Sequence, residues 1–472
     1  MKNHLETIQQ HHHELFRVYQ DRMRINHRLD RRLVSYQANK HRSGYNWFKY
    51  REGFSSQLVD YLLKEIHPIP GRLLDPFAGS GSALFAAALQ GWETCGIDVL
   101  PVGAQVIRAR IAAEQVSPHS LANAVRDVLT VNLTDYYDDS LAFQHIPITY
   151  GAYNPDNERE LVGYLSYCKT KIADEQIQEI LKFAAFCVLE EISYTRKDGQ
   201  FLRWDARSGR SLGKKPFFKE KIWSFREAIT MKLSQIVSDI TSYRIFDFDP
   251  VSNNNHPKIY VGSSLDILPT LDREDFDVIL TSPPYCNRYD YTRTYALELV
   301  YLGYRHEDVT RLRQAMLSCT VENKDKQQHM RVLYQQLNRI ADFNRITAVY
   351  EAQYGLHEVL DLLEQQRDAN LLNNPHIVRM VRNYFYEMSF VIFEMSQLLA
   401  PQGHIIMVND NVRYGGEEIP VDLILSNIAT AYGLEVEHIW SLPKGKGNSS
   451  QQMGLYGRSE LRKGVYVWKR SE

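Results

Sequence analysis

The sequence predicts an α/β protein with a doubly wound, mostly parallel sheet, an antiparallel edge strand and two largely helical insertions. Short apolar segments alternate with helical segments, which is the pattern of βαβ units. A glycine-containing turn joins the first such strand to the first helix, and long polar stretches interrupt the alternation twice. A chain of 472 residues is long enough for one large domain with insertions, or for two to three domains.

The first βαβ unit lies near the front of the chain. Residues 73–74 read as a short buried strand, 77–81 as the turn, 83–89 as an alanine-rich helix and 94–97 as the next strand, which ends at Asp98. The two strands of such a unit are parallel, so their carboxyl ends lie at the same edge of the sheet. We therefore expect the turn and Asp98 to lie close together.

The alternation resumes after each interruption. Later strands are expected at residues 258–262, 277–280, 404–408, 434–440 and 464–468. The last two are expected to pair antiparallel at the sheet edge. The predicted organisation is an N-terminal helical segment (1–44), a sheet domain (45–130, 251–301 and 386–472) and two insertions (131–250 and 302–385).

The composition is that of an ordinary globular protein, with 44% hydrophobic and 24% charged residues. The formal net charge is −2, so a nucleic-acid surface has to be a local basic patch. The five cysteines are scattered without a Cys-x-x-Cys pair, which argues against a metal site and fits a reducing compartment. No apolar signal core or membrane-spanning stretch is visible, so we expect a cytoplasmic protein with no membrane partner.

Residues 75–81 (DPFAGSG) predict a binding site for a nucleoside-bearing cofactor. Gly79 and Gly81 permit the backbone angles that let N–H groups approach a ligand, and Asp98, 17 residues after Gly81, is placed to accept ribose hydroxyls. Asp75 suits a cationic group better than a pyrophosphate, and no third glycine completes a dinucleotide fingerprint. Close strand–helix packing alone would also explain the glycines, but it leaves Asp75, Phe77 and Asp98 without a role.

Residues 281–285 (TSPPY) predict a clamp for an exocyclic amine of a nucleobase. The Ser282 hydroxyl and the Pro283 carbonyl can accept hydrogen bonds from the two amine N–H groups, and Pro284 stiffens the turn. Tyr285 can stack on a base that has left the duplex. The alternative is a simple turn ended by two prolines, but this turn follows a predicted parallel strand, where ligands bind in such sheets.

Basic residues gather in residues 196–226, where ten basic and three acidic residues give a local net charge of +7. Arg203, Arg207 and Arg210 lie among aromatic residues there, and we expect them to contact phosphates or guanine edges. Arg288 and Arg293 follow the clamp in an aromatic-basic segment that reads as a lid or a DNA-contacting loop. For both segments the alternative is a solvated surface. We rank a catalytic role for Cys286 low, because no basic partner is near in sequence.

Together these motifs resemble those of the DNA amino-methyltransferases, which form N4-methylcytosine or N6-methyladenine. Residues 75–81 are similar to the cofactor motif of this family, Asp98 to its second motif, and residues 281–285 to its catalytic motif. Asp266 resembles the acidic residue near the cofactor adenine. Residues 47–55 resemble the segment that closes over the methionine end, which implies cofactor contacts for Lys49, Phe54 and Ser55.

The resemblance implies a Rossmann-like methyltransferase sheet, S-adenosyl-L-methionine as cofactor and double-stranded DNA, with its target base flipped, as substrate. Serine at the first clamp position leans toward cytosine N4 over adenine N6 in that family. It also implies a bacterial, nucleoid-associated enzyme with a restriction or defence-system partner. Residues 447–458 could line the base pocket, and residues 131–250 are the leading target-recognition candidate. An RNA methyltransferase and a non-catalytic cofactor-binding subunit remain as alternatives.

Overall fold

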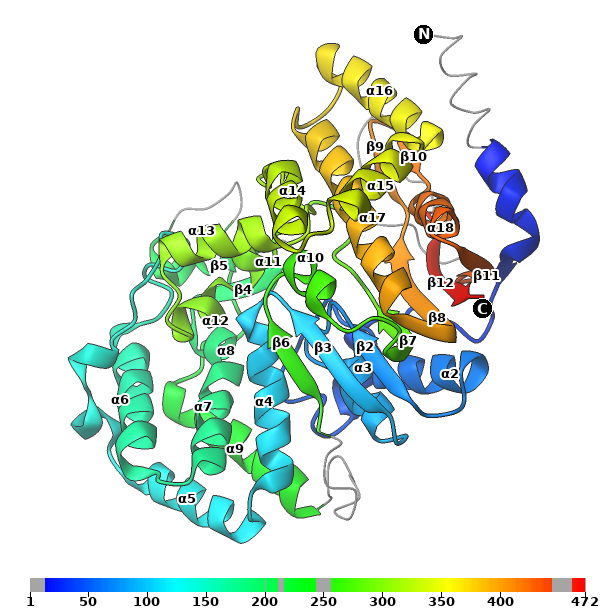
Figure 1. The fold of residues 1–472 in the computed structure, drawn as a ribbon. Coiled ribbons are helices and arrows are strands. Elements are labelled where there is room, and N and C mark those ends of the chain that lie inside the picture. The colour runs from blue at the N-terminus through cyan, green and yellow to red at the C-terminus, as the bar shows by residue number, and fades with distance from the viewer. Residues whose placement is uncertain (1–12, 200, 211–215, 243–255, 444–460, 472) are drawn as a thin grey trace.

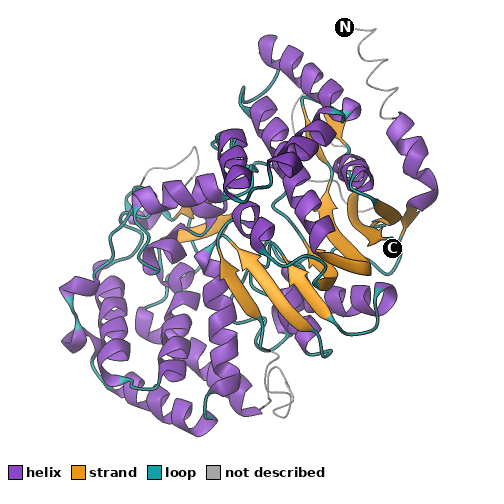
Figure 2. Cartoon of the chain, in the orientation of Figure 1, coloured by secondary structure: helices purple, strands orange, loops and turns teal. Residues whose placement is uncertain are grey.

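A computed structural model describes residues 13–199, 201–210, 216–242, 256–443 and 461–471 (Figure 1). An eight-stranded mixed sheet lies at its centre, in the order β1-β11-β12-β8-β7-β2-β3-β6 (Figure 2). The bounds are β1 Met23–Ile25, β2 Arg72–Asp75, β3 Glu93–Asp98, β6 Lys258–Val261, β7 Phe276–Thr281, β8 Leu399–Asp410, β11 Leu434–Ser441 and β12 Lys463–Arg470. The α/β fold class predicted from the sequence is confirmed.

The five strands from β8 to β6 run parallel, whereas β12 is antiparallel to both of its neighbours. The predicted antiparallel pair of late strands is therefore present. It does not form the edge, because β1 pairs parallel with the outer side of β11. Residues 1–44 were expected to be helical, but their described part also contributes this strand to the sheet.

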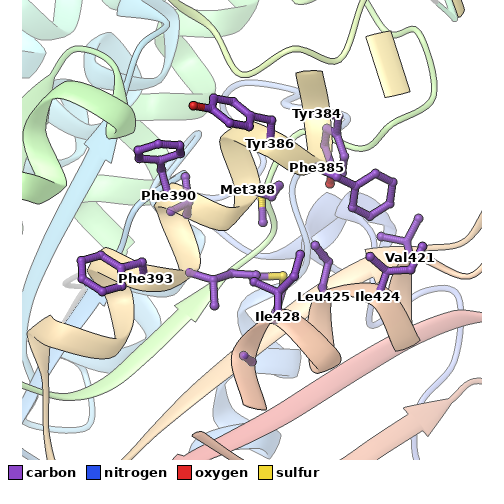
Figure 3. Close-up of a cluster of buried hydrophobic side chains, with 14 of the residues drawn as sticks. Tyr384, Phe385, Tyr386, Met388, Phe390, Phe393, Val421, Ile424, Leu425 and Ile428 are labelled. Atoms are coloured by element: carbon purple, nitrogen blue, oxygen red, sulfur yellow. The ribbon is translucent and has the colours of Figure 1, made fainter. Parts of the chain in front are cut away.

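Alternating residues of each strand face opposite layers of helices, as the pleat of a sheet requires. Leu73, Val278 and Ile406 pack with α2 (Ser56–Ile66) and α3 (Ser82–Ala88), and Ile107 of α4 (Pro101–Gln115) joins this cluster. On the opposite face, Leu74 and Ile279 pack with α17 (Ile377–Leu398) and α18 (Val421–Ala431). Figure 3 shows buried aromatic and aliphatic side chains that α17 and α18 contribute to this cluster.

The first insertion joins β3 to β6 and packs on α4 through a separate hydrophobic core (Figure 1). Its helices are α5 Pro118–Thr130, α6 Pro155–Lys171, α7 Glu175–Cys187, α8 Leu189–Ile192 and α9 Phe225–Ser242. The sequence predicts a largely helical insertion, but the structure adds an antiparallel hairpin of β4 (Thr195–Asp198) and β5 (Phe201–Trp204). This hairpin carries the start of the basic segment, with Arg196, Lys197 and Arg203.

The second insertion is helical, as predicted from the sequence. The helices between β6 and α17 are α10 Ser264–Ile267, α11 Tyr291–Thr294, α12 Ala296–Tyr301, α13 His306–Ala315, α14 Gln327–Gln336, α15 Ile340–Glu351 and α16 Tyr354–Asp368. A small hairpin of β9 (Val412–Tyr414) and β10 (Glu417–Ile419) follows β8. Single 3-10 turns occupy Gln20–Arg22, Tyr36–His41, Leu133–Tyr136, Asp139–Leu141, Ala206–Ser208 and Leu268–Thr270.

The carboxyl edge of the parallel strands gathers several polar residues. Strands β2, β3, β7 and β8 end at Asp75, Asp98, Thr281 and Asp410, respectively. Open α/β sheets bind ligands outside this edge. The two sequence motifs follow β2 and β7, which are hydrogen-bonded neighbours, so the fold brings together segments about two hundred residues apart.

Candidate active site

The turn after β2 adopts the backbone conformation that its glycines permit. Gly79 and Gly81 have φ angles of +52° and +76°, in the left-handed region that favours glycine. A Cβ atom on Gly79 would lie 2.9 Å from the Tyr50 ring, and one on Gly81 would lie 2.8 Å from Cγ1 of Ile107. Both positions therefore require glycine for space as well as for backbone angle.

Asp98 holds this turn in place. Its Oδ2 accepts a hydrogen bond from the Gly79 N–H and its Oδ1 one from the Leu100 N–H, each at 2.6 Å. Burial raises the pKa of Asp98 to about 6, against the lowering effect of the two N–H groups. Each carboxylate oxygen has a further lone pair, so these bonds leave capacity for ribose hydroxyls.

Asp75 connects the two motifs. Its Oδ1 accepts hydrogen bonds from the Phe77 N–H at 3.1 Å and from the Thr281 hydroxyl at 2.7 Å. Burial raises the pKa of Asp75 to about 7. Both of these bonds end on Oδ1, which leaves Oδ2 as the carboxylate oxygen that a cationic ligand group could approach.

A cavity of about 620 Å³, the first cavity, opens beside the glycine turn. Its walls include Tyr50, Glu52, Gly53, Phe54, Asp75, Phe77, Gly79, Asp98, Ser282, Pro284 and Tyr291. Five of the predicted cofactor residues thus line one cavity, namely Phe54, Asp75, Phe77, Gly79 and Asp98. The predicted catalytic residues Ser282 and Pro284 line the same cavity.

A second cavity of about 1260 Å³ adjoins the first. Its walls include Arg51, Glu52, Gly53, Gly199, Ser282, Pro283, Tyr285, Tyr289, Tyr291, Asp410, Asn411 and Lys463. Glu52, Gly53, Ser282 and Tyr291 line both cavities. The clamp residues divide between them, because Pro284 faces the first cavity and Pro283 the second. Ser282 therefore lies in the wall between two ligand-sized spaces.

Side chains of the second cavity form a connected polar group. The Ser282 hydroxyl donates to the Tyr285 hydroxyl at 3.1 Å. The ammonium of Lys463 lies 5.7 Å from the centre of the Tyr285 ring and 3.3 Å from Oδ2 of Asp410. Burial raises the pKa of Tyr285, so its hydroxyl stays protonated near neutral pH. Cys286 is fully buried with its pKa raised well above the usual value, which argues against a thiolate nucleophile.

Two characterised relatives match nearly the whole chain. M.AvaI, a type II methyltransferase of Anabaena variabilis, is 43% identical over 470 residues, or 96% of this chain and 92% of M.AvaI. The type II methyltransferase M.BsoBI of Geobacillus stearothermophilus is 38% identical over 459 residues, or 94% of this chain and 88% of M.BsoBI. The chain belongs to the type II DNA methyltransferase family. No protein-family model and no solved structure matches it.

Four of the residues predicted to contact the cofactor in this methyltransferase are absent from the walls of the first cavity. Lys49 is exposed. Ser55 caps α2, because its hydroxyl accepts the Leu58 N–H at 3.2 Å and donates to the Leu33 carbonyl at 2.8 Å. Asp266 pairs with His329 at 2.6 Å and is absent from the cavity walls. Gly81 supports the turn from outside the cavity.

The predicted DNA-contacting arginines differ in their surroundings. Arg207 pairs with the buried Asp205, and this pairing lowers the pKa of that carboxyl. Arg210 donates to the Pro147 carbonyl at 2.8 Å. Arg203 lies on the exposed face of β5, with its guanidinium 4.4 Å from the Phe217 ring centre. Arg207 and Arg210 therefore have buried-carboxylate or backbone partners, whereas Arg203 faces outward and pairs with the exposed Asp198, at 3.4 Å.

Arg288 precedes α11, and Arg293 lies within it. Arg288 donates to the Asn373 amide oxygen at 3.1 Å, and Arg293 pairs with Asp290 at 3.2 Å and with Glu322 at 2.9 Å. Both arginines thus connect the segment after the clamp to the second insertion. The predicted late loop at residues 447–458 lies outside the described residues.

Sequence reasoning missed several residues of the site. Glu52 accepts hydrogen bonds from the hydroxyls of Tyr289 and Tyr295 and lines both cavities. Asp410 ends β8 at the carboxyl edge, a position that the strand rule could have identified. Lys463 begins the antiparallel β12 directly opposite Asp410, which no local pattern indicates.

Neither a metal-binding cluster nor a membrane-spanning helix is found in the part of the chain that the structure describes. No cluster of three or more His, Cys, Asp or Glu side chains with metal-binding geometry occurs among them. None of their helices is both long and apolar enough to cross a lipid bilayer.

Proposed function

We propose that this protein transfers a methyl group from S-adenosyl-L-methionine to the exocyclic amine of a flipped base in double-stranded DNA, with cytosine N4 favoured over adenine N6. The observation that carries the proposal is the position of Ser282 in the wall between the two cavities. A group held there can approach ligands in both spaces, which is the geometry that transfer between two bound molecules requires.

The residues of the first cavity fit the proposed cofactor. Gly79 presents backbone that no larger residue could, the ionised Asp75 can pair with an ammonium group, and Asp98 can accept ribose hydroxyls. Phe54 and Phe77 supply apolar walls. When bound, the cofactor would supply an electrophilic methyl group.

The residues of the second cavity fit a base amine. Its nitrogen is a weak nucleophile because its lone pair is delocalised into the ring. The Ser282 hydroxyl directs its proton to Tyr285, so its lone pairs remain free to accept an amine N–H. The Pro283 carbonyl can accept the second N–H, and the pair would favour a tetrahedral nitrogen as the bond forms. The Tyr285 ring can stack on the base.

The preference for cytosine rests on the serine of the clamp, which in the resembling family leans toward cytosine. For the larger organisation, we propose that residues 45–130, 251–301 and 386–472 form the catalytic domain and that residues 131–250 recognise DNA. The exposed Arg203 and the basic balance of residues 196–226 support this assignment. A cognate restriction endonuclease in a bacterial cell is the partner that such an activity implies.

One experiment tests the proposal. The protein is incubated with methyl-labelled S-adenosyl-L-methionine and unmethylated genomic DNA or total RNA, and the digested nucleosides are identified by mass spectrometry. We expect label in N4-methylcytosine from DNA. Label in N6-methyladenine would correct the base, label confined to RNA would correct the substrate, and no label with either would refute the proposal. Bisulfite-independent sequencing of the modified DNA then locates the methylated site.

A further inference from the structure

The β4–β5 hairpin has one buried face and one exposed face. Burial alternates along both strands, so that Lys197 and Leu202 face inward while Arg196, Phe201 and Arg203 face outward. Arg196 lies opposite Arg203 in the antiparallel register of the hairpin. Both guanidinium groups lie over the Phe217 ring, at 6.0 and 4.4 Å from its centre. The exposed face therefore combines two arginines and aromatic surface with one acidic side chain, Asp198, which pairs with Arg203 at 3.4 Å.

The inward face anchors the hairpin to the catalytic side of the molecule. The Lys197 ammonium pairs with the carboxylate of Glu298 in α12, and both side chains are almost completely buried. Arg51, which lines the second cavity, donates to the Lys197 carbonyl at 2.7 Å. Breaking one partner of such a buried pair is strongly unfavourable, so the hairpin is fixed relative to the cavity.

The turn of the hairpin lies at the wall of the second cavity. Gly199 lines this cavity together with Pro283 and Tyr285, and its carbonyl accepts a hydrogen bond from the Tyr289 hydroxyl at 3.1 Å. Phe201 pairs with Asp198 across this turn and is two residues from Gly199. Phe201 is therefore close in the chain to the cavity-lining turn, while its side chain lies on the exposed face of the hairpin.

Phe201 is 60% exposed, although its neighbours Leu202 and Trp204 are buried. A large exposed apolar ring, two residues from a turn that lines the cavity and on the same hairpin face as two arginines, has the chemistry of the wedges that some DNA-binding proteins insert between base steps. Extrusion of a base costs stacking and pairing energy, and an inserted aromatic ring compensates for part of that cost.

We propose that Phe201 is a wedge that enters the DNA base stack beside the target base and stabilises the flipped state. This inference rests on the proposed function, because it assumes a duplex whose target base occupies the second cavity. Arg196 and Arg203 would hold the adjoining phosphates, and Phe201 would occupy the space that the target base leaves.

The test compares single-turnover methylation of two duplexes by the wild-type protein and by Phe201→Ala. Both duplexes carry the site located by sequencing, and the second has an abasic position opposite the target, so that its base is already unpaired. On the ordinary duplex we expect Phe201→Ala to lower the rate by about 5- to 150-fold, the factor that corresponds to stacking on one base. On the second duplex the loss should shrink to a few-fold.

Matched variants separate a wedge from a general loss of exposed apolar surface. Ile69→Ala removes a side chain that is 74% exposed in the loop before β2, at the amino edge of the sheet, and should methylate both duplexes as the wild type does. Phe201→Trp should retain most of the rate. Binding of S-adenosylhomocysteine by every variant checks that the fold is intact.

A wild-type rate for Phe201→Ala, or an equal loss on both duplexes, would overturn the wedge and leave the proposed function intact. If the wild-type protein transfers no methyl group to any DNA, the proposed function fails and the wedge fails with it.

Discussion

Cofactor affinity should depend on pH through Asp75. Burial raises the pKa of Asp75 to about 7, and the proposed ammonium partner of this residue binds its ionised form. For a pKa of 7, the ionised fraction of Asp75 rises about eightfold between pH 6.0 and 7.5. The ionised fraction of Asp98, which has a pKa of about 6, rises about twofold over the same pH range. We therefore expect the affinity for S-adenosylhomocysteine to rise by roughly an order of magnitude.

Isothermal titration calorimetry at pH 6.0, 6.5, 7.0 and 7.5 measures this dependence. Asp75→Asn removes the titrating carboxyl but can still accept from Phe77 and Thr281, so it should bind weakly and leave only the twofold change from Asp98. An unchanged pH dependence in Asp75→Asn would refute the assignment of the ammonium site to Asp75.

The same pKa shift has the opposite sign for the stability of the free protein. The folded pKa of Asp75 lies above its unfolded value of about 4, so the folded state binds the proton more tightly. The contribution of Asp75 to the free energy of unfolding is therefore fully present below pH 4 and is lost as the pH rises through about 7. A bound ligand that prefers the ionised form should offset this loss in thermal melts.

Three further substitutions separate the other roles. Asp98→Ala should weaken S-adenosylhomocysteine binding by about 1.5–3 kcal/mol in calorimetry, because it removes a charged acceptor and releases the Gly79 turn. Tyr285→Phe keeps the ring but no longer orients the Ser282 hydroxyl, so the single-turnover rate should fall about 2- to 13-fold with DNA affinity unchanged. Neutralising Arg203 should lower the salt slope of DNA binding by about one. Arg207→Ala should instead lower the midpoint of denaturant titrations, because it leaves the buried Asp205 without its guanidinium partner.

The sequence predicts the central sheet well because its strands are apolar and bounded by turns. Val278, Ile279 and Leu280 are consecutive apolar residues of β7, and their side chains pack into the two opposite helix layers in turn. The two motifs are recognisable because each immediately follows such a strand. Their proximity follows from β2 and β7 being parallel neighbours.

The hairpin of the first insertion escapes prediction for a specific reason. Lys197 occupies an inward position of β4, where an apolar residue would have revealed the alternation, and only its tertiary partner Glu298 makes that burial tolerable. Similarly, Lys463 reaches the site because β12 runs antiparallel and so begins at the carboxyl edge. Asp266 was predicted to contact the cofactor but pairs with His329 instead. This pairing depends on the fold of the second insertion, which the sequence motif does not indicate.

The most direct test of the account is the single-turnover methylation rate of Ser282→Ala, measured with cofactor and DNA affinities in parallel. Ser282 lies between the two cavities and is proposed to accept a hydrogen bond from the amine as it becomes tetrahedral. We expect the rate to fall by roughly 10- to 1,000-fold while both affinities stay near wild type, because the interaction matters most in the transition state. A wild-type rate would contradict the clamp mechanism.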